Sequence, residues 1–279
     1  MTQDFGAFDV DAFVRATLAE DMGTGGDRTS AAVIPVGAVL AAVMDSRDAV
    51  TVAGLPLAAA FFRAIDADCS IETLVPEGET VAAGTDLMRI TGNARALLAA
   101  ERSALNTVQH LTGIATMTRA YVDAIAGTGA ILLDTRKTLP GLRVLEKYAT
   151  RMGGATNHRM RLDDGVMIKD NHIAVAGGVD AAVRAAKAAG LTGVVVEVDT
   201  LDQIAPALAG GADRLLLDNM GPAVLRQAVT LIAGRVPTEA SGGVNLSTIR
   251  AIAETGVTYI SVGRITQSAP AADIGLDYA

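Results

Sequence analysis

The sequence predicts an α/β protein whose second half forms an incomplete barrel of parallel strands. Half of the 279 residues are hydrophobic, tryptophan is absent, and alanine, valine and glycine dominate, as expected for buried parallel strands that alternate with helices. From residue 131 onward, six strand-length apolar runs alternate with helical segments, and this alternation indicates a closed or nearly closed parallel sheet. Six strands are fewer than the usual eight, so we expect a modified barrel.

The overall composition excludes several classes of protein. A formal net charge of -8 and a pI near 4.9 argue against a nucleic-acid partner, because such a partner favours a basic face. The single cysteine, Cys69, excludes an internal disulfide and fits a reducing compartment. The N-terminus has no basic region followed by an apolar run, and no apolar stretch reaches about 18 residues. We therefore expect a cytoplasmic protein without a signal peptide or membrane partner.

Short elements of mixed type precede the predicted barrel. The apolar spacing predicts helices over Val10–Ala19 and Leu55–Ala64. Three strands are predicted at residues 38–44, 71–75 and 86–91. The longest helical pattern follows from Asn93 to about Ala126, and Gly113 is expected to interrupt it.

A line of polar residues runs along that long helix. Arg102, Asn106 and His110 recur at four-residue spacing, so they share one face of the helix. A solvated face is the ordinary explanation of such a line. Because leucine, alanine and valine surround it on nearly every side, we favour a line that faces a pocket or another subunit.

The stretch from Asp134 to His172 is basic although the whole chain is acidic. Its cations are Arg136, Lys137, Arg143, Lys147, Arg151, Arg159, Arg161 and Lys169. Such a concentration indicates a pocket for a small polyanionic ligand. The apolar runs 131–133 and 166–168 both end abruptly in charge, and a helix between them starts near Pro140 and stops at Gly153-Gly154.

The strand–helix alternation continues to the end of the chain. Strands are predicted at 194–198, 214–218, 237–240 and 259–263, with helices near 173–189, 200–209, 222–233 and 246–255. In barrels of this kind the active-site residues lie at the C-terminal ends of the strands. Those ends are Thr135-Arg136-Lys137, Lys169, Glu197, Asp218, Ser241-Gly242-Gly243 and Gly263.

The strand ends carry cations first, carboxylates next and glycines last. Backbone N–H groups near the late glycines can hold a phosphate. Glu197 and Asp218 end apolar strands, where each carboxylate needs a lysine, a ribose hydroxyl or hydrated Mg²⁺. Taken singly, a Gly-Gly pair, a strand-end lysine, His158 and His172 are more often structural. Their occurrence at successive strand ends indicates a site for a sugar phosphate and a second anion.

Long segments of the chain also resemble a known family. They are LAEDMGTGGDRTS, ERSALNTVQHLTGIAT, DTRKTLPGLRVLEKYA, GGATNHRMRLDDGVMIKDNHI, VEVDTLD, LLLDNM, EASGGVNL and AETGVTYISVGRITQSAPAADIGLDY. They are similar to the quinolinate phosphoribosyltransferases, also called nicotinate-nucleotide pyrophosphorylases (carboxylating), over nearly the whole chain. One segment departs from the family: where Gly-Ala-Leu-Thr-His-Ser is frequent, this chain has residues 263–268, which include Arg264 and Gln267.

The resemblance implies a particular domain organisation and assembly. It implies an N-terminal α/β sandwich domain over residues 1–110 and an atypical, incomplete TIM-like barrel over 111–265 that carries the active site. The C-terminal tail, 266–279, is a candidate to join the first domain. The family also implies a homodimer with shared active sites, in which Arg102 reaches the substrate of the neighbouring subunit. A higher homo-oligomer stays open.

The resemblance further implies a reaction and roles for residues. Quinolinate and 5-phosphoribosyl-1-pyrophosphate would give nicotinate mononucleotide, pyrophosphate and CO₂ in NAD biosynthesis, with Mg²⁺ and no redox cofactor. Quinolinate would be bound by Arg102, Thr135, Arg136, His158, Arg159 and Lys169. The phosphoribosyl group would be bound by Lys137, Glu197, Asp218, Ser241, Gly242, Gly243, Val262, Gly263 and Arg264. Lys137, Glu197 and Asp218 are the expected catalytic residues, and the two carboxylates are the expected metal ligands, directly or through water.

Alternative functions remain at this point. A related enzyme could act on another ring acid, as nicotinate phosphoribosyltransferase does, or as the relative found with molybdate transport does. Lys137 or Lys169 could form a Schiff base in an aldolase-type lyase. A non-catalytic anion-binding protein is disfavoured, because binding alone needs no carboxylates at the same mouth. The two acidic residues followed by Thr-Thr of the common phosphoribosyltransferases are absent, so the donor is identified by the resemblance.

Overall fold

The structure, a computed structural model, describes residues 5, 6 and 8–279. The expectation of no signal peptide rests partly on residues 1–4 and 7, which lie outside the described residues. The chain divides into two compact units. The first comprises residues 1–119, 144–154 and 268–279, and the second comprises 120–143 and 155–267. No helix in the described part of the chain has the length and apolarity that a membrane span requires.

The first unit is built on a four-stranded antiparallel sheet in the order β12-β1-β5-β3. The strands are β1 (Val39–Ser46), β3 (Ser70–Thr73), β5 (Thr85–Asn93) and β12 (Ile274–Tyr278), with a separate pair β2 (Val50–Thr51) and β4 (Thr80–Val81). The helices are α1 (Val10–Met22), α2 (Arg28–Val33), α3 (Leu55–Ile65), most of α4 (Ala94–Ala124) and of α5 (Arg143–Met152).

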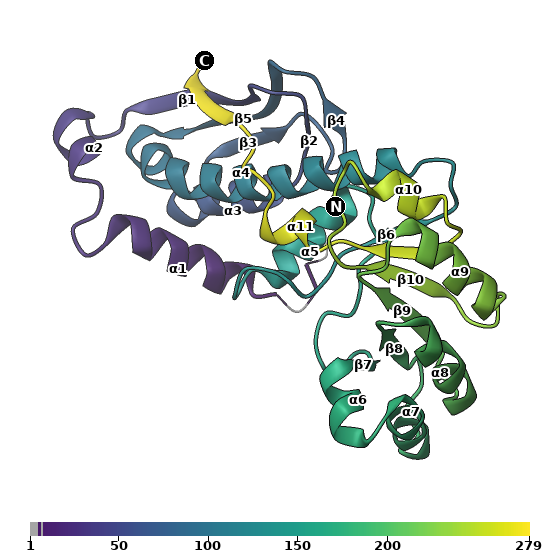
Figure 1. The fold of residues 1–279 in the computed structure, drawn as a ribbon. Helices are drawn as coiled ribbons and strands as arrows, with labels where there is room; N and C mark the ends of the chain where they lie inside the picture. Colours follow the sequence, from purple (N-terminus) through teal and green to yellow (C-terminus); the bar gives the residue numbers. More distant parts are fainter. Residues whose placement is uncertain (1–4, 7) are drawn as a thin grey trace. The chain divides into compact units, whose positions relative to one another are not determined.

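Helices α3 and α4 lie along one face of this sheet (Figure 1). The core between them includes Met44 and Met88 from the strands and Phe61 and Leu97 from the helices, all at most 1% exposed. The alternating burial of β1 supplies its core face, and the apolar side of α3 supplies the other. An N-terminal domain made of a sheet and helices, as predicted, is confirmed.

The predicted interruption of the long helix is wrong. Helix α4 runs unbroken from Ala94 to Ala124, through Gly113. A Cβ at Gly113 would collide with the backbone carbonyl of Pro270, so glycine serves a close approach of two segments of the first unit rather than a break. The structure also explains one residue of the polar line on this helix: His110 Nε2 lies 3.0 Å from Oε1 of the buried Glu146 on α5.

The second unit is a six-stranded sheet in the order β6-β11-β10-β9-β8-β7, with all neighbours parallel. The strands are β6 (Ile131–Leu133), β7 (Met167–Ile168), β8 (Val195–Val198), β9 (Arg214–Asp218), β10 (Thr238–Ser241) and β11 (Tyr259–Ser261). Each strand except β6 and β7 lies between its neighbours in the chain or closes the order by placing β6 beside β11, as in a barrel. Within the described residues, however, β6 and β7 do not pair, and on that side β6 makes only an isolated bridge from Leu133 to Thr156. The predicted incomplete barrel is confirmed.

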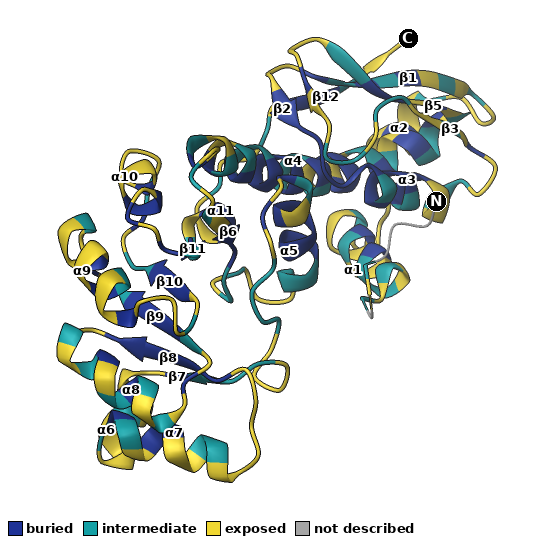
Figure 2. Cartoon of the chain, turned by 90° about the vertical axis from the view of Figure 1, so that its right-hand side faces the viewer, coloured by how far each residue is buried: buried dark blue, intermediate teal, exposed yellow. Residues whose placement is uncertain are grey.

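Helices connect the barrel strands. They are α6 (Asp170–Ala176), α7 (Val179–Ala188), η1 (Leu201–Gln203), α8 (Ile204–Gly210), α9 (Pro222–Ile232) and α10 (Ile249–Ala253), and α11 (Arg264–Gln267) follows the last strand. Buried strands β9 and β10 contrast with the exposed outer sides of α8 and α9 (Figure 2). The helix predicted near 173–189 is two helices, since Gly177 and Gly178 adopt φ of 86° and 128°, values that end a helix.

The strand register places the predicted site residues at one edge of the sheet. Asp218 pairs with Ser241, and Glu197 lies opposite Leu216 on β9. Because all six strands are parallel, their C-terminal ends meet at the same edge. The residues that directly follow β6 and β7 therefore reach the edge at which Glu197, Asp218 and Ser241 lie.

Candidate active site

A cavity of about 540 Å³ opens at the C-terminal edge of the barrel strands. It is lined by Thr135, Arg136, Lys137, His158, Arg159, Met167, Lys169, Glu197, Leu216, Asp218, Asn219, Glu239, Ser241, Gly242, Gly243, Val244, Ser261, Val262, Gly263, Arg264 and Gln267. All of these residues belong to the second unit. The volume is within the range that suits small-molecule ligands.

Every site residue predicted in the barrel lines this cavity. The remaining one, Arg102, lies on α4 in the first unit, is exposed and is not among the lining residues. Its expected reach to a neighbouring subunit stays a prediction. The departure from the family motif falls inside the cavity, because Arg264 and Gln267 both line it.

Only half of the cations in the basic stretch line the cavity: Arg136, Lys137, Arg159 and Lys169. The others serve different parts of the fold. Arg143 braces two loops by donating to Thr138 Oγ1 and to the Met160 carbonyl, each at 3.1 Å. Lys147 is fully buried on α5, Arg151 lies 5.7 Å from the Tyr148 ring centroid, and Arg161 pairs with Asp163 at 2.8 Å.

The cations that do line the cavity are crowded. Burial, and then the neighbouring charge of Arg136, lower the pKa of Arg159. Its Nη1 donates to the Gly165 carbonyl at 2.9 Å, which holds one side of the guanidinium. Lys169 Nζ lies 2.8 Å from Glu197 Oε2. Positive groups held this close to one another favour an anionic ligand.

Three carboxylates form a second feature of the cavity region. One oxygen from each of Glu197, Asp199 and Asp218 lies within 4.8 Å of the others. Burial, followed by the charges of Glu197 and Asp199, raises the pKa of Asp218. Carboxylate oxygens gathered in this way are the donors that Mg²⁺ and similar hard cations prefer, and the residues present therefore fit such an ion. Asp199, which directly follows the strand end at Val198, was not predicted, because Glu197 was taken as the charged end of that strand.

The glycine segments permit a close approach of backbone to a ligand. Gly242 and Gly243 have φ of 91° and 62°, which is the left-handed region that glycine adopts without strain. A Cβ at Gly263 would lie 2.7 Å from Lys137 Cδ. Thr266 Oγ1 donates to the Lys137 carbonyl at 2.6 Å, so the last loop and the loop after β6 are tied together.

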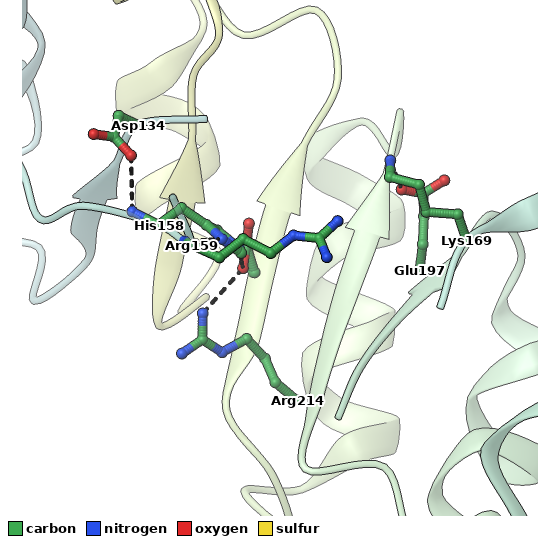
Figure 3. A network of polar contacts seen from close by, with 7 residues as sticks. Asp134, His158, Arg159, Lys169, Glu197 and Arg214 are labelled. Carbon is green, nitrogen blue, oxygen red and sulfur yellow. Dashed lines mark hydrogen bonds and ion pairs between the residues drawn. The ribbon is translucent and has the colours of Figure 1, made fainter. Parts of the chain in front are cut away.

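Two polar residues of the cavity wall, Glu239 and Asn219, were missing from the site predicted from the sequence. Glu239, on β10, is fully buried and accepts a hydrogen bond from Arg214 at 3.2 Å (Figure 3). Asn219 donates to the neighbouring Asp218 carboxylate at 2.5 Å. The signal for Glu239 was present, since a charged residue in the middle of a predicted buried strand is unusual, but only strand ends were considered.

Comparison with known proteins matches both units to one family. The family model for the N-terminal domain of quinolinate phosphoribosyl transferase matches residues 27–112, and the model for its C-terminal domain matches residues 114–277. A nicotinate-nucleotide pyrophosphorylase (carboxylating) of Mycobacterium leprae is 43% identical over 95% of each chain. A rice relative described as chloroplastic is 41% identical, over 96% of this chain and 77% of its own length.

A solved structure agrees with these sequence matches. The nicotinate-nucleotide pyrophosphorylase of Francisella tularensis superposes with a TM-score of 0.93, at 38% identity, over the whole of both chains. A similarity of sequence and fold that extends through both units cannot be a chance match of a common barrel. The chain therefore belongs to the quinolinate phosphoribosyltransferase family.

Proposed function

We propose that the barrel cavity is where this chain carries out the reaction of its family, nicotinate-nucleotide pyrophosphorylase (carboxylating) activity in NAD biosynthesis. The phosphoribosyl group of 5-phosphoribosyl-1-pyrophosphate is transferred to the ring nitrogen of quinolinate. The adjacent carboxylate leaves as CO₂, so the products are nicotinate mononucleotide, pyrophosphate and CO₂. The observation that carries this assignment is the meeting of five cations, two strand-end carboxylates and a glycine rim in one cavity.

Quinolinate is a dicarboxylate and belongs at the cationic part of the cavity. Arg136 and Arg159 offer planar pairs of donors that match carboxylates, and Lys169 offers a point charge. Thr135 and His158 complete this side, together with Arg102 of the partner subunit. The ion pair between Lys169 and Glu197 supports this placement, because an incoming carboxylate can replace Glu197 as the partner of the lysine.

The phosphoribosyl donor belongs at the opposite part of the cavity. Backbone N–H groups at Ser241, Gly242 and Gly243 are suited to the 5′-phosphate, since no side chain obstructs the approach at the two glycines. Val262 and Gly263 close this side from the next strand. Arg264 lines the same cavity, and we assign it to the phosphate, where it replaces a smaller residue of the usual family motif.

The carboxylates Glu197 and Asp218 would hold Mg²⁺ together with the pyrophosphate, directly or through water, and Asp199 offers a third carboxylate oxygen close to theirs. When bound, Mg²⁺ neutralises part of the charge on the departing pyrophosphate. Glu197 and Asp218 also face the ribose, where positive charge develops as the bond at C1′ breaks. This charge is larger in the transition state than in the bound substrates, so the carboxylates accelerate the reaction.

Lys137 is placed between the two substrates. Its backbone is fixed by Thr135 and Thr266, while its exposed side chain extends along Gly263. From there the ammonium can contact both the pyrophosphate and a carboxylate of quinolinate. Once the ring nitrogen is quaternised, its positive charge stabilises the electron pair that the departing CO₂ leaves on the adjacent ring carbon, and a proton then bonds to that carbon to give nicotinate mononucleotide. No redox cofactor is needed for that step.

We also propose a homodimer with shared active sites, with a higher oligomer left open. Arg102 lies on an exposed helix position of the first unit, as a residue offered to a neighbour should. The cytoplasmic location suggested by the single cysteine stays a prediction. The Schiff-base alternative is less favoured, because Lys169 is engaged in an ion pair with Glu197.

The test is a comparison of two ring acids. The purified chain is incubated with 5-phosphoribosyl-1-pyrophosphate, Mg²⁺ and either quinolinate or nicotinate, and nicotinate mononucleotide and CO₂ are measured. Product from quinolinate alone is expected, because the cavity supplies cations for two carboxylates. Product from nicotinate alone would assign the related reaction to this chain, and no product from either would refute the proposed reaction.

A further inference from the structure

Glu239 is a fully buried carboxylate in the middle of the barrel sheet. Its Oε2 accepts a hydrogen bond from Arg214 Nη1 at 3.2 Å, and His158 Nε2 lies 3.4 Å from the same oxygen. The Arg214 guanidinium in turn lies 4.3 Å from the ring centroid of Tyr259. A buried carboxylate is costly unless it is paired. Glu239 is paired on one side with a scaffold cation and on the other with a residue of the cavity wall.

The hydrogen bonds of His158 determine which ring nitrogen carries its proton. The backbone N–H of Arg159 donates to His158 Nδ1 at 2.7 Å, which requires a lone pair on that nitrogen. The ring proton is therefore on Nε2, the nitrogen that faces Glu239. Nδ1 is occupied by a backbone N–H, and Nε2 is buried 3.4 Å from Glu239 Oε2, so the ring presents no exposed N–H to a substrate carboxylate.

The same geometry fixes the neighbouring arginine from several directions. Asp134 accepts from the His158 backbone N–H at 2.8 Å, and the Arg159 backbone is bonded to the His158 ring. The Arg159 side chain leaves this anchored turn and extends toward Lys169 and Glu197 (Figure 3), with which it lines the cavity. The orientation of the His158 ring therefore fixes the Arg159 backbone, from which the guanidinium side chain extends into the cavity.

We propose that Glu239 is a positioning residue for quinolinate: it holds the His158 ring through Nε2, and that ring holds Arg159 in the orientation that receives a substrate carboxylate. The proposal rests on the proposed function and refines it, because His158 acts on the substrate through Arg159 instead of by direct contact. Burial raises the pKa of Glu239, but the neighbouring His158, Ser261 and Arg214 outweigh burial and lower it overall. The ionised carboxylate accepts N–H donors at both oxygens and carries no proton of its own.

The decisive variant is Glu239→Gln, which keeps the size of the side chain and removes its charge. The KM for quinolinate and the dissociation constant of quinolinate, measured by calorimetry, are expected to rise by roughly ten- to a hundredfold, the range typical of residues that orient a ligand-binding group. The KM for the phosphoribosyl donor should stay within about twofold. A merely structural loss would affect both substrates alike.

Glu146→Gln is the matched control. Glu146 is also a fully buried carboxylate beside a histidine, with His110 at 3.0 Å, but it lies in the first unit and does not line the cavity. The same substitution there should lower the thermal unfolding temperature without a selective change in the KM for quinolinate. An equal rise of that KM in both variants would overturn the proposal.

A double-mutant cycle with His158→Asn tests the route of the effect. If Glu239 acts through His158, then adding Glu239→Gln to His158→Asn should change quinolinate affinity by less than about twofold. Additive losses of quinolinate affinity in the double variant, or an unchanged KM for quinolinate in Glu239→Gln, would overturn the proposed role of Glu239. Should Glu239→Gln fail to fold, Arg214→Gln removes the guanidinium that donates to the same carboxylate at 3.2 Å and must show a smaller but equally selective rise. If the unmodified chain does not convert quinolinate, the proposed function itself fails.

Discussion

At the scale of single residues, the cavity contains side chains whose charged form is disfavoured by burial and by neighbouring charges of the same sign. Asp218 is the plainest case, since burial and the charges of Glu197 and Asp199 all raise its pKa. A carboxylate with a raised pKa is ionised at neutral pH only at a cost in stability. Function explains why it is retained, because a cation or a developing positive charge needs it there.

Asp218→Asn should raise the stability of the ligand-free chain and abolish its activity. Because the pKa of Asp218 is raised on folding, its contribution to stability is full below its ordinary pKa and is lost as the pH rises through the raised value. At pH 7 the variant should therefore unfold about 2 °C higher, and the gain should vanish in acid. Its kcat should fall at least about tenfold, as measured by steady-state kinetics.

Asp213→Asn is the control, because the pKa of Asp213 is shifted in the opposite direction. The hydrogen bond from Lys187 lowers the pKa of Asp213 despite partial burial. Its contribution to stability is present above its ordinary pKa and is lost as the pH falls through the lowered value. This variant should be less stable at pH 7 and fully active. A loss of stability in Asp218→Asn would contradict the role given to burial and to the carboxylate cluster.

The sequence predicted residues of the cavity wall where chemistry follows a strand. Lys169, Glu197 and Asp218 were found because an apolar run ends in charge at each of them. Asp199 and Glu239 were not predicted by the same rule, the first because Glu197 was taken as the charged end of its strand and the second because it lies inside a strand. Contacts between strands, which place Glu239 against Arg214 and His158, are not encoded in the local pattern.

At the scale of elements, glycine has opposite meanings in different helices. Gly177 and Gly178 separate α6 from α7 with positive φ, as glycine commonly does. Gly113 leaves α4 continuous and instead makes room for the backbone at Pro270. The sequence alone cannot separate these cases, since the segment that approaches Gly113 follows more than 150 residues later.

Gly113→Ala should destabilise the first unit. In an ordinary helix this change would stabilise by up to about 1 kcal/mol. Here the added methyl group would collide with the Pro270 carbonyl, and overpacking of this kind costs about 1–3 kcal/mol. The measurement is thermal or denaturant unfolding. Gly25→Ala is the control, because nothing lies within 4 Å of its Cβ position, and a stability loss equal to that control would contradict the packing explanation.

At the scale of the whole molecule, an open six-stranded barrel was predictable from the count and order of apolar runs. The C-terminal tail was expected as a candidate to join the first domain, but its antiparallel pairing with β1 was not predictable, because it joins strands far apart in the sequence. The proposed role of Arg102 in a neighbouring subunit's active site also belongs to the scale of the whole molecule. The residue lies outside the cavity of its own chain, and the proposed dimer gives it a function.

Mixed dimers test the shared site. Arg102→Ala and Lys137→Ala should each be nearly inactive, whereas their co-expression should restore activity to about one quarter of normal, since half of the dimers are mixed and each has one intact site. Lys137→Ala with Glu197→Gln is the control, because both changes lie in the barrel and should not complement each other. Absence of recovery with Arg102→Ala would reject sharing through that residue.

The most direct test of the central assignment is to measure CO₂ and nicotinate mononucleotide together, from quinolinate and its donor, in the unmodified chain and in Lys137→Ala. We expect equal amounts of both products and a loss of kcat of more than about tenfold in the variant, with unfolding unchanged. Lys187→Ala, which removes a lysine paired with Asp213 outside the cavity, should keep normal activity. An unchanged kcat in Lys137→Ala, or CO₂ without nucleotide, would contradict the assignment of the reaction to this cavity.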